Sequence, residues 1–210
     1  MNFILVVFML FLNLSCSVFG ERSVEELKYE LILREGNNEI RRYPAYIVAQ
    51  VTVDTDEKPE SKAFRILAGY IFGDNKSKSS IAMTAPVMTN EKKVSEKINM
   101  TAPVLMESTE NNKTTMSFSM PSKYSIQDLP EPNDKRVKLA NVSEHFMAAF
   151  VFSGFWGKEK NAKLAEDLKQ WLVKHPEYRQ ISKPFFAGYN PPWTLPFLRR
   201  NEILIKLEKQ

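Results

Sequence analysis

The chain has 210 residues, of which 43% are hydrophobic and 26% charged, with a formal net charge of +4. This length suffices for one sizeable core or two small ones, and 7 Gly with 12 Pro exclude a collagen-like or low-complexity chain. Basic residues form no run longer than a pair, such as Arg41-Arg42, so the basic footprint of a nucleic-acid-binding protein is missing.

Residues 1–20, MNFILVVFMLFLNLSCSVFG, contain no charged side chain and are mostly apolar. The apolar run is short for a bilayer span and resembles the core of a signal peptide, with small residues suited to cleavage before Glu21. We therefore predict a signal peptide, export through the secretory pathway to a secreted or periplasmic location, and no transmembrane span after cleavage. An uncleaved anchor is the alternative. A lipid anchor at Cys16 fits poorly, because Asn13 stands where lipoprotein signals carry an aliphatic residue.

Cys16 is the only cysteine in the chain, so the processed protein would have neither a disulfide nor thiol chemistry. Four Asn-X-Ser/Thr sequons would accept glycans if the source is eukaryotic, although Ser and Thr are common enough for chance to explain them: Asn75, Asn99, Asn112 and Asn141.

Residues 21–210 are expected to form a single α+β domain. Alternation, turn residues and helical periodicity predict elements in this chain order: strands at 28–36, 38–44 and 45–53, a helix at 60–72, two strands in the repeated segments described below, strands at 114–121, 136–142 and 145–154, a helix at 158–174, and strands at 183–190 and 201–209. This order suggests two similar halves of about 90 residues, each an antiparallel sheet with one helix, curved or closed like a barrel.

The two helices differ in their apolar surface. The second carries a stripe about 120° wide, typical of a helix that lies on a sheet, made of Leu164, Leu168, Trp171 and Leu172. The first carries apolar residues over about 240° of its circumference: Ala63, Phe64, Ile66, Leu67, Ala68, Tyr70, Ile71 and Phe72. One sheet cannot cover this surface, so it must meet loops of the same chain, a protein partner, or an apolar ligand in a cleft.

A short segment occurs twice, as IAMTAPVMT at 81–89 and as INMTAPVLM at 98–106. In a strand, Met83 and Met100 would each face the same way as the aliphatic residues two positions away. They either fill core volume or wall a cleft beside the first helix. Pro86 and Pro103 cannot donate to a ladder, so each strand must end there, bulge, or lie at an edge.

Several blocks resemble the SOUL family, also called the haem-binding protein family, in the family's own order: YELILREGNNEIRRYPAYIVAQV, AFRILAGYIFG, KINMTAPV, MSFSMPSKYSIQDLPEPND, FSGFW and AGYNPPWTLPFLRRNEILIKL. The resemblance implies a distorted antiparallel β-barrel flanked by two helices and built from two pseudo-repeated halves, as in bacterial effector-binding domains. It also implies reversible, non-covalent binding of haem or another tetrapyrrole in a surface cleft beside the first helix. Some members carry one Met-Thr-Ala-Pro-Val segment and others two, which implies local copying of one strand, with 98–104 in the usual place.

Taken with the helix pattern, the resemblance implies a cleft lined by Lys62, Phe64, Arg65, Ile66, Leu67, Tyr70, Met83 and Met100. Arg65 matches a basic position that would meet the haem propionates. In certain members a histidine proposed to ligate iron occupies the position of Arg42, and an arginine cannot ligate iron. His145 and His175 are expected to serve structure. The prediction is therefore haem as a non-covalent ligand without strong iron coordination, and no metal site.

An enzyme is not expected, because the sequence lacks a nucleophile–base pair, a carboxylate dyad and a phosphate loop. Arg199-Arg200-Asn201-Glu202 is interpreted instead as a polar anchor between the last strand and the neighbouring loop. The predicted function is that of a binding or carrier protein. The alternative is a module for a different hydrophobic small molecule or a peptide.

Overall fold

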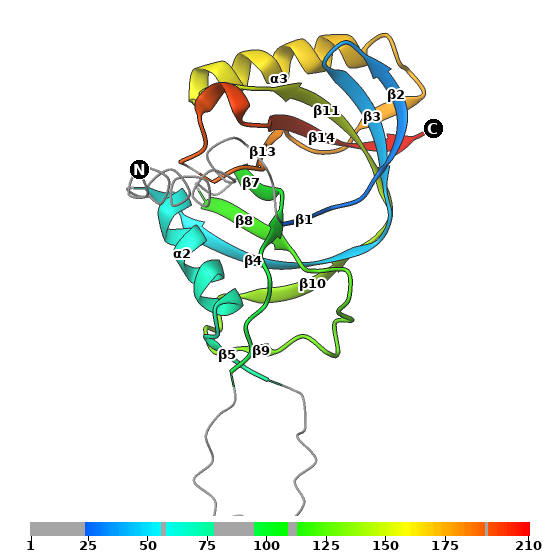
Figure 1. The fold of residues 1–210 in the computed structure, drawn as a ribbon. Helices are drawn as coiled ribbons and strands as arrows, with labels where there is room; N and C mark the ends of the chain where they lie inside the picture. Colours follow the sequence, from blue (N-terminus) through cyan, green and yellow to red (C-terminus); the bar gives the residue numbers. More distant parts are fainter. Residues whose placement is uncertain (1–23, 56–57, 78–94, 109–112, 192) are drawn as a thin grey trace, which may run out of the picture. The chain divides into compact units, whose positions relative to one another are not determined.

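The structure is a computed structural model, and it describes residues 24–55, 58–77, 95–108, 113–191 and 193–210. The chain divides into two compact units, the first made of Met1–Pro44 with His145–Gln210 and the second of Ala45–Glu144. Each unit contains an antiparallel sheet and one long helix (Figure 1). The predicted α+β class with one helix in each half is confirmed.

The sequence suggested two halves that follow one another along the chain, but the structure divides the chain differently. The second unit is inserted into the first, because strand β3 (Asn38–Tyr43) pairs antiparallel with β11 (His145–Phe152). Ile40 and Met147, on these two strands, are almost fully buried. Burial of these apolar side chains stabilises the pairing of β3 with β11, two strands far apart in the sequence.

In the first unit the strand order is β13-β14-β11-β3-β2, and β12 pairs with β14. Helix α3 (Lys158–Leu172) packs on β11 and β14 (Figure 1). Its buried residues are Ala165, Leu168, Trp171 and Leu172, and Leu164 is half-buried, so the predicted stripe is confirmed with Ala165 added. The remaining elements of this unit are β1 (Glu25–Glu26), β2 (Glu30–Glu35), β12 (Tyr178–Gln180), β13 (Phe185–Gly188), the 3-10 helix η1 (Pro196–Leu198) and β14 (Asn201–Lys209).

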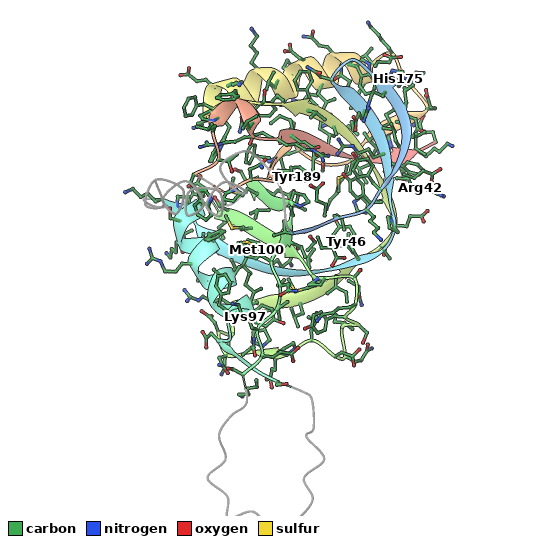
Figure 2. All side chains as sticks on the ribbon, in the orientation of Figure 1. Arg42, Tyr46, Lys97, Met100, His175 and Tyr189 are labelled. Carbon is green, nitrogen blue, oxygen red and sulfur yellow. The ribbon has the colours of Figure 1, made fainter. Side chains whose placement is uncertain are left out.

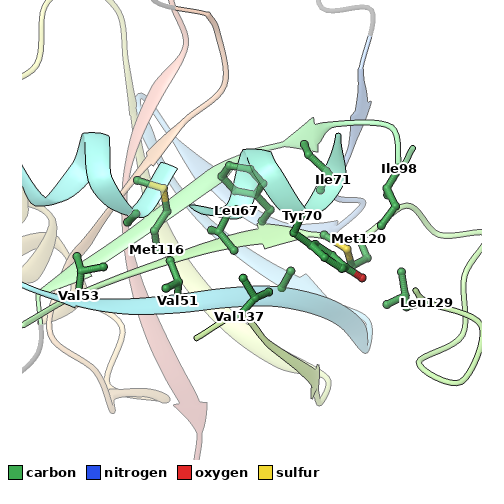
Figure 3. Close-up of a cluster of buried hydrophobic side chains, with 13 residues drawn as sticks. Val51, Val53, Leu67, Tyr70, Ile71, Ile98, Met116, Met120, Leu129 and Val137 are labelled. Carbon is green, nitrogen blue, oxygen red and sulfur yellow. The ribbon is translucent and has the colours of Figure 1, made fainter. Parts of the chain in front are cut away.

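In the second unit the strand order is β10-β4-β8-β7, and helix α2 (Pro59–Ile71) lies against β4 and β8. Figure 3 shows the core cluster between this helix and the sheet, to which Leu67, Tyr70, Val51 and Met116 belong. The strands of this unit are β4 (Tyr46–Asp54), β5 (Asn75–Lys76), β6 (Thr101–Ala102), β7 (Val104–Ser108), β8 (Lys113–Ser119), β9 (Glu131–Pro132) and β10 (Lys138–Val142).

The ends of α2 follow the sequence signals. Pro59 occupies the first turn, where its missing N–H has no helical partner to lose. The helix ends before Gly73, whose φ of 118° lies in a region that side chains with a Cβ rarely adopt. The predicted stop at Gly73 is therefore confirmed.

The second copy of the repeated segment forms β6 and the start of β7, and Pro103 separates the two strands. Of the three outcomes predicted for Pro103, a strand end, a bulge or an edge position, the structure shows a strand end. Thr101 of this copy is buried and donates its hydroxyl to the carbonyl oxygen of Ser119. The first copy, with Met83 and Pro86, lies outside the described residues, as does the expected signal peptide at 1–20.

Candidate ligand site on helix α2

The outer face of α2 carries exposed aromatic residues. Ala63, Leu67 and the other sheet-facing residues are buried, whereas the side chain of Phe64 is 40% exposed and that of Phe72 is 59% exposed. Phe64 is steadied by an edge-on contact with Phe118, with ring centroids 5.5 Å apart. Within the second unit, the helix therefore has apolar surface that the sheet does not cover, as the sequence predicted.

The predicted cleft residues divide into two groups. Lys62, Phe64 and Arg65 are exposed on the outer face, and Ile66 is half-buried. Leu67 and Tyr70 face the sheet, where both are almost fully buried. The Tyr70 hydroxyl donates to the carbonyl oxygen of Pro130 at 2.9 Å.

Of the two predicted methionines, Met100 is partly buried against the same core cluster as Ile66, and Met83 lies outside the described residues. Lys62, Phe64 and Arg65 are thus the exposed members of the predicted set. The structure places Leu67 and Tyr70 beneath the outer face, in the core.

Two residues near this face were missing from the predicted site. Lys97 places its Nζ atom 5.7 Å from the centre of the Phe72 ring, and Figure 2 shows Lys97 beside α2. Phe72 follows Arg65 by seven positions, a spacing that places both on one stripe of a helix, so the sequence contained that signal. Lys97 comes from a distant part of the chain, and no local pattern marks it.

The two histidines lie in the first unit and have structural neighbours. His145 stacks on Tyr43, with centroids 5.7 Å apart. His175, just after α3 (Figure 2), has its Nε2 atom 3.7 Å from a carboxylate oxygen of Glu35 and its Nδ1 atom 3.8 Å from one of Glu177. The side chain of His175 therefore lies between two carboxylates.

Among the residues that the structure describes, no group of three or more His, Cys, Asp or Glu side chains is arranged to hold a metal ion. Arg42, at the position where certain family members carry histidine, forms an ion pair with Glu30. The second unit, which carries α2, contains no histidine in its sequence.

A network of buried charges lies in the first unit. The Arg41 guanidinium donates to Glu202 at 2.7 and 3.0 Å and to Glu39 at 2.6 Å. Tyr189 donates its hydroxyl to Glu202 at 2.8 Å, and Arg200 donates to the same carboxylate at 2.8 Å. Arg41 and Glu202 are both fully buried.

This arrangement controls the ionisation of Glu202. Burial by itself raises the pKa of Glu202, but the hydrogen bond from Arg41 and the charges of Arg41 and Arg200 outweigh it and hold the pKa below its usual value. Asn201 and Arg199 donate to the carbonyl oxygens of Gly154 and Thr194. The segment therefore anchors β14 to its neighbouring loops, as the sequence indicated.

Solved structures with this two-unit α+β architecture define the fold class. A hydrolase from Listeria innocua superimposes with a TM-score of 0.54 at 14% identity, over 84% of this chain and 94% of that one. The EcmrR C-terminal domain gives 0.53 at 14% identity, over 87% and 99%. At such identity the likeness concerns the fold alone.

Comparison of the sequence with known families assigns the chain to one family. The family described as "SOUL heme-binding protein" matches residues 24–95 and 88–206, so this chain belongs to the SOUL family. "Heme-binding protein 2" of Mus musculus is 29% identical over 170 residues, which cover 80% of this chain and 77% of that protein. The two matched ranges overlap at 88–95, between the two copies of Met-Thr-Ala-Pro-Val.

Proposed function

We propose that this protein binds haem or another tetrapyrrole non-covalently on the outer face of α2. Family membership and the likeness to a protein named for haem binding support this ligand class. The observation that carries the location is the pair of exposed rings, Phe64 and Phe72, flanked by Lys62, Arg65 and Lys97. A porphyrin is flat and apolar with anionic propionates, which suits aromatic surface beside cationic side chains.

The other predicted residues have supporting roles in this proposal. Ile66 and Met100, both partly buried, would form the edge of the apolar surface. Leu67 and Tyr70 would hold α2 on its sheet rather than touch the ligand, because both are almost fully buried. Met83 stays a predicted contact that the described residues do not test.

The proposed role is that of a carrier and not of an enzyme. The exposed residues of α2 are Glu60, Ser61, Lys62, Phe64 and Arg65, a set without the histidine, cysteine or paired carboxylates of common nucleophile–base pairs. Export of the protein, as residues 1–20 suggest, would place this carrier outside the cytoplasm. In the part of the chain that the structure describes, no helix combines the length and apolarity needed to cross a bilayer.

A hemin titration followed at the Soret band tests this proposal. We expect a shift that saturates near one equivalent, and we expect Arg65→Glu to weaken the affinity about five- to tenfold, because a charge that attracts propionate becomes one that repels it. The matched control is Lys138→Glu, an exposed lysine of the same unit on β10. Its neighbour Leu139 packs against the core beneath α2, so Lys138 points to the opposite face of the sheet.

If Arg65→Glu and Lys138→Glu lowered the affinity for hemin equally, the change in net charge would explain the effect, and Arg65 would not belong to the site. A wild-type protein that never shifts the Soret band would favour the alternative ligand class, another hydrophobic small molecule or a peptide.

Iron is expected to contribute little to binding. The unit that carries α2 has no histidine, and the Met100 thioether is packed against the core. Protoporphyrin IX without iron should therefore bind within about twofold of hemin, as measured by fluorescence quenching. His145→Ala and His175→Ala should leave the Soret shift unchanged. If either variant stays folded but loses the shift, binding without histidine coordination is wrong.

A further inference from the structure

Two loops of the first unit expose five large apolar side chains, a set we call the aromatic patch. The loop after β11 contributes Phe155, 71% exposed, and Trp156, 46% exposed. The loop before β14 contributes Trp193 (64%), Leu195 (37%) and Phe197 (69%). Soluble proteins seldom expose so many large apolar side chains together unless the surface binds something.

Direct contacts hold the two loops together. The Gly154 N–H donates to the carbonyl oxygen of Pro196 at 2.8 Å, and Asn201 Nδ2 donates to the carbonyl oxygen of Gly154 at 3.1 Å. The Arg199 guanidinium lies 5.8 Å from the centre of the Phe155 ring. Figure 1 shows η1, within the second loop, beside the N-terminal end of α3. The aromatic patch is therefore one surface held by the fold.

Trp156 is partly exposed and also packs against the strand beneath it. Its ring stacks on Phe186 of β13, with centroids 4.7 Å apart and 29° between the planes. Gly154 has a φ of 94°, a conformation that only glycine adopts without strain, so the turn that presents Phe155 and Trp156 depends on this residue. The position of the exposed Phe155 and Trp156 rings is thus fixed by the turn at Gly154 and by the contact with Phe186.

The charge around the patch is strongly basic. Residues 152–163 and 191–201 carry Lys158, Lys160, Lys163, Arg199 and Arg200 against one acidic residue, Glu159. Arg200 is ion-paired with Glu202 and Glu26, so the other residues leave an excess of three positive charges. Lys160 donates to the carbonyl oxygen of Phe155 at 2.9 Å, which places its charge at the margin of the rings.

We propose that the aromatic patch binds the surface of an anionic lipid bilayer. Tryptophan and phenylalanine side chains insert at the boundary between head groups and acyl chains, and the basic side chains around them attract anionic head groups. A bilayer adapts to side chains that project from separate loops, whereas a protein partner would need a matching surface. The proposal concerns the first unit and is independent of the haem site proposed on α2.

Tryptophan fluorescence of the full chain tests the contact directly. Trp156 and Trp193 belong to the patch, Trp171 is 8% exposed and bonded to Glu35, and residues 1–20 contain no tryptophan. Vesicles of phosphatidylcholine with about 30% phosphatidylserine should shift the emission to the blue, and brominated lipid should quench it. Trp171→Phe should keep the shift, and Trp193→Phe should reduce it.

Co-sedimentation with the same vesicles measures the affinity. We expect the triple variant Phe155→Ser/Trp193→Ser/Phe197→Ser to lower partitioning at least about tenfold. The matched control, Val173→Ser/Ile181→Ser, removes two side chains of the same unit that are 79% and 53% exposed but lie outside the patch, and it should leave partitioning unchanged. Lys158→Gln and Lys163→Gln should each lower binding to anionic vesicles about fivefold and leave pure phosphatidylcholine unaffected.

Three results would overturn the proposal. Sedimentation without a change in tryptophan emission would assign lipid binding to another part of the chain. Full partitioning of the triple variant would exclude the patch from the contact. A dimer in light scattering that the triple variant dissociates, without vesicle binding, would assign the patch to a second copy of the chain. The hemin titration contains no lipid, so each of these results leaves the proposed haem site standing.

Discussion

Replacing Arg41 with methionine is expected to lower the free energy of unfolding by about 3–5 kcal/mol. Arg41 is fully buried and bonded to both Glu39 and Glu202. Methionine fills much of the volume but leaves two buried carboxylates without their main cation, which costs more than the original pair contributed. Urea denaturation followed by far-UV circular dichroism measures the change.

Arg42→Met is the matched control for this substitution. Arg42 is the next residue on β3, but its side chain is 45% exposed and pairs with Glu30, which is 56% exposed. A surface pair of this kind contributes about 0–1 kcal/mol. Equal losses of stability in the two variants would mean that the buried network is not what stabilises β3.

The same network predicts the response to acid. The pKa of Glu202 lies below its usual value of 4.5, so its ionised form stabilises the fold above that pH, and this contribution is lost as the pH falls through the folded-state pKa. Glu202→Gln should therefore be less stable than the wild type at neutral pH, and the difference should shrink as the pH falls below 4.5 and through the folded-state pKa of Glu202. If the difference in stability between Glu202→Gln and the wild type did not change with pH, the charge of Glu202 would not be what stabilises the network.

Asn75→Ala is expected to cost about 3 kcal/mol of unfolding free energy, since buried polar groups lose their partners. The Asn75 side chain is buried, and its Nδ2 atom donates at 2.7 Å to the carbonyl oxygens of both Tyr70 and Glu96. Its Oδ1 atom accepts from the Glu96 N–H at 2.9 Å. This one amide therefore joins the end of α2 to the chain that leads into the second repeat copy.

Asn133→Ala provides the control for Asn75. Asn133 makes one exposed hydrogen bond, from its Nδ2 atom to Asp74 at 2.9 Å, so its loss should cost less than about 1 kcal/mol. Thermal and urea unfolding of both variants give the comparison. If Asn75→Ala unfolds like the wild type, the hydrogen bonds of the Asn75 amide to Tyr70 and Glu96 are dispensable for stability.

The hydrogen bonds of the Asn75 side chain also affect its availability for glycosylation. The Asn75 amide nitrogen that would carry a glycan is bonded to two carbonyl groups in the folded protein, whereas Asn99 and Asn141 are exposed. Pattern alone ranked the sequons equally, because a sequon records a local tripeptide and not the accessibility of its amide.

Several features were predictable from local signals. Both helices, the stop at Gly73, the break at Pro103 and the long strands follow from periodicity, turn residues and the missing N–H of proline, which act over a few residues. The exposed face of α2 was predictable for the same reason, because its apolar arc is wider than one sheet can cover.

Other features depend on the tertiary structure. Arg41 and Arg42 are neighbours of the same type in the sequence, yet one is fully buried and the other exposed, because alternation along β3 turns them to opposite faces and the partner of Arg41 is Glu202 on β14. Lys97 reaches Phe72, and the loop of Gly154 meets that of Pro196, only through folding. The sequence by itself determined where helices, strands and apolar faces begin and end, since these depend on nearby residues. Tertiary structure decided which charges are buried and which loops share a surface, since those depend on residues far apart in the chain.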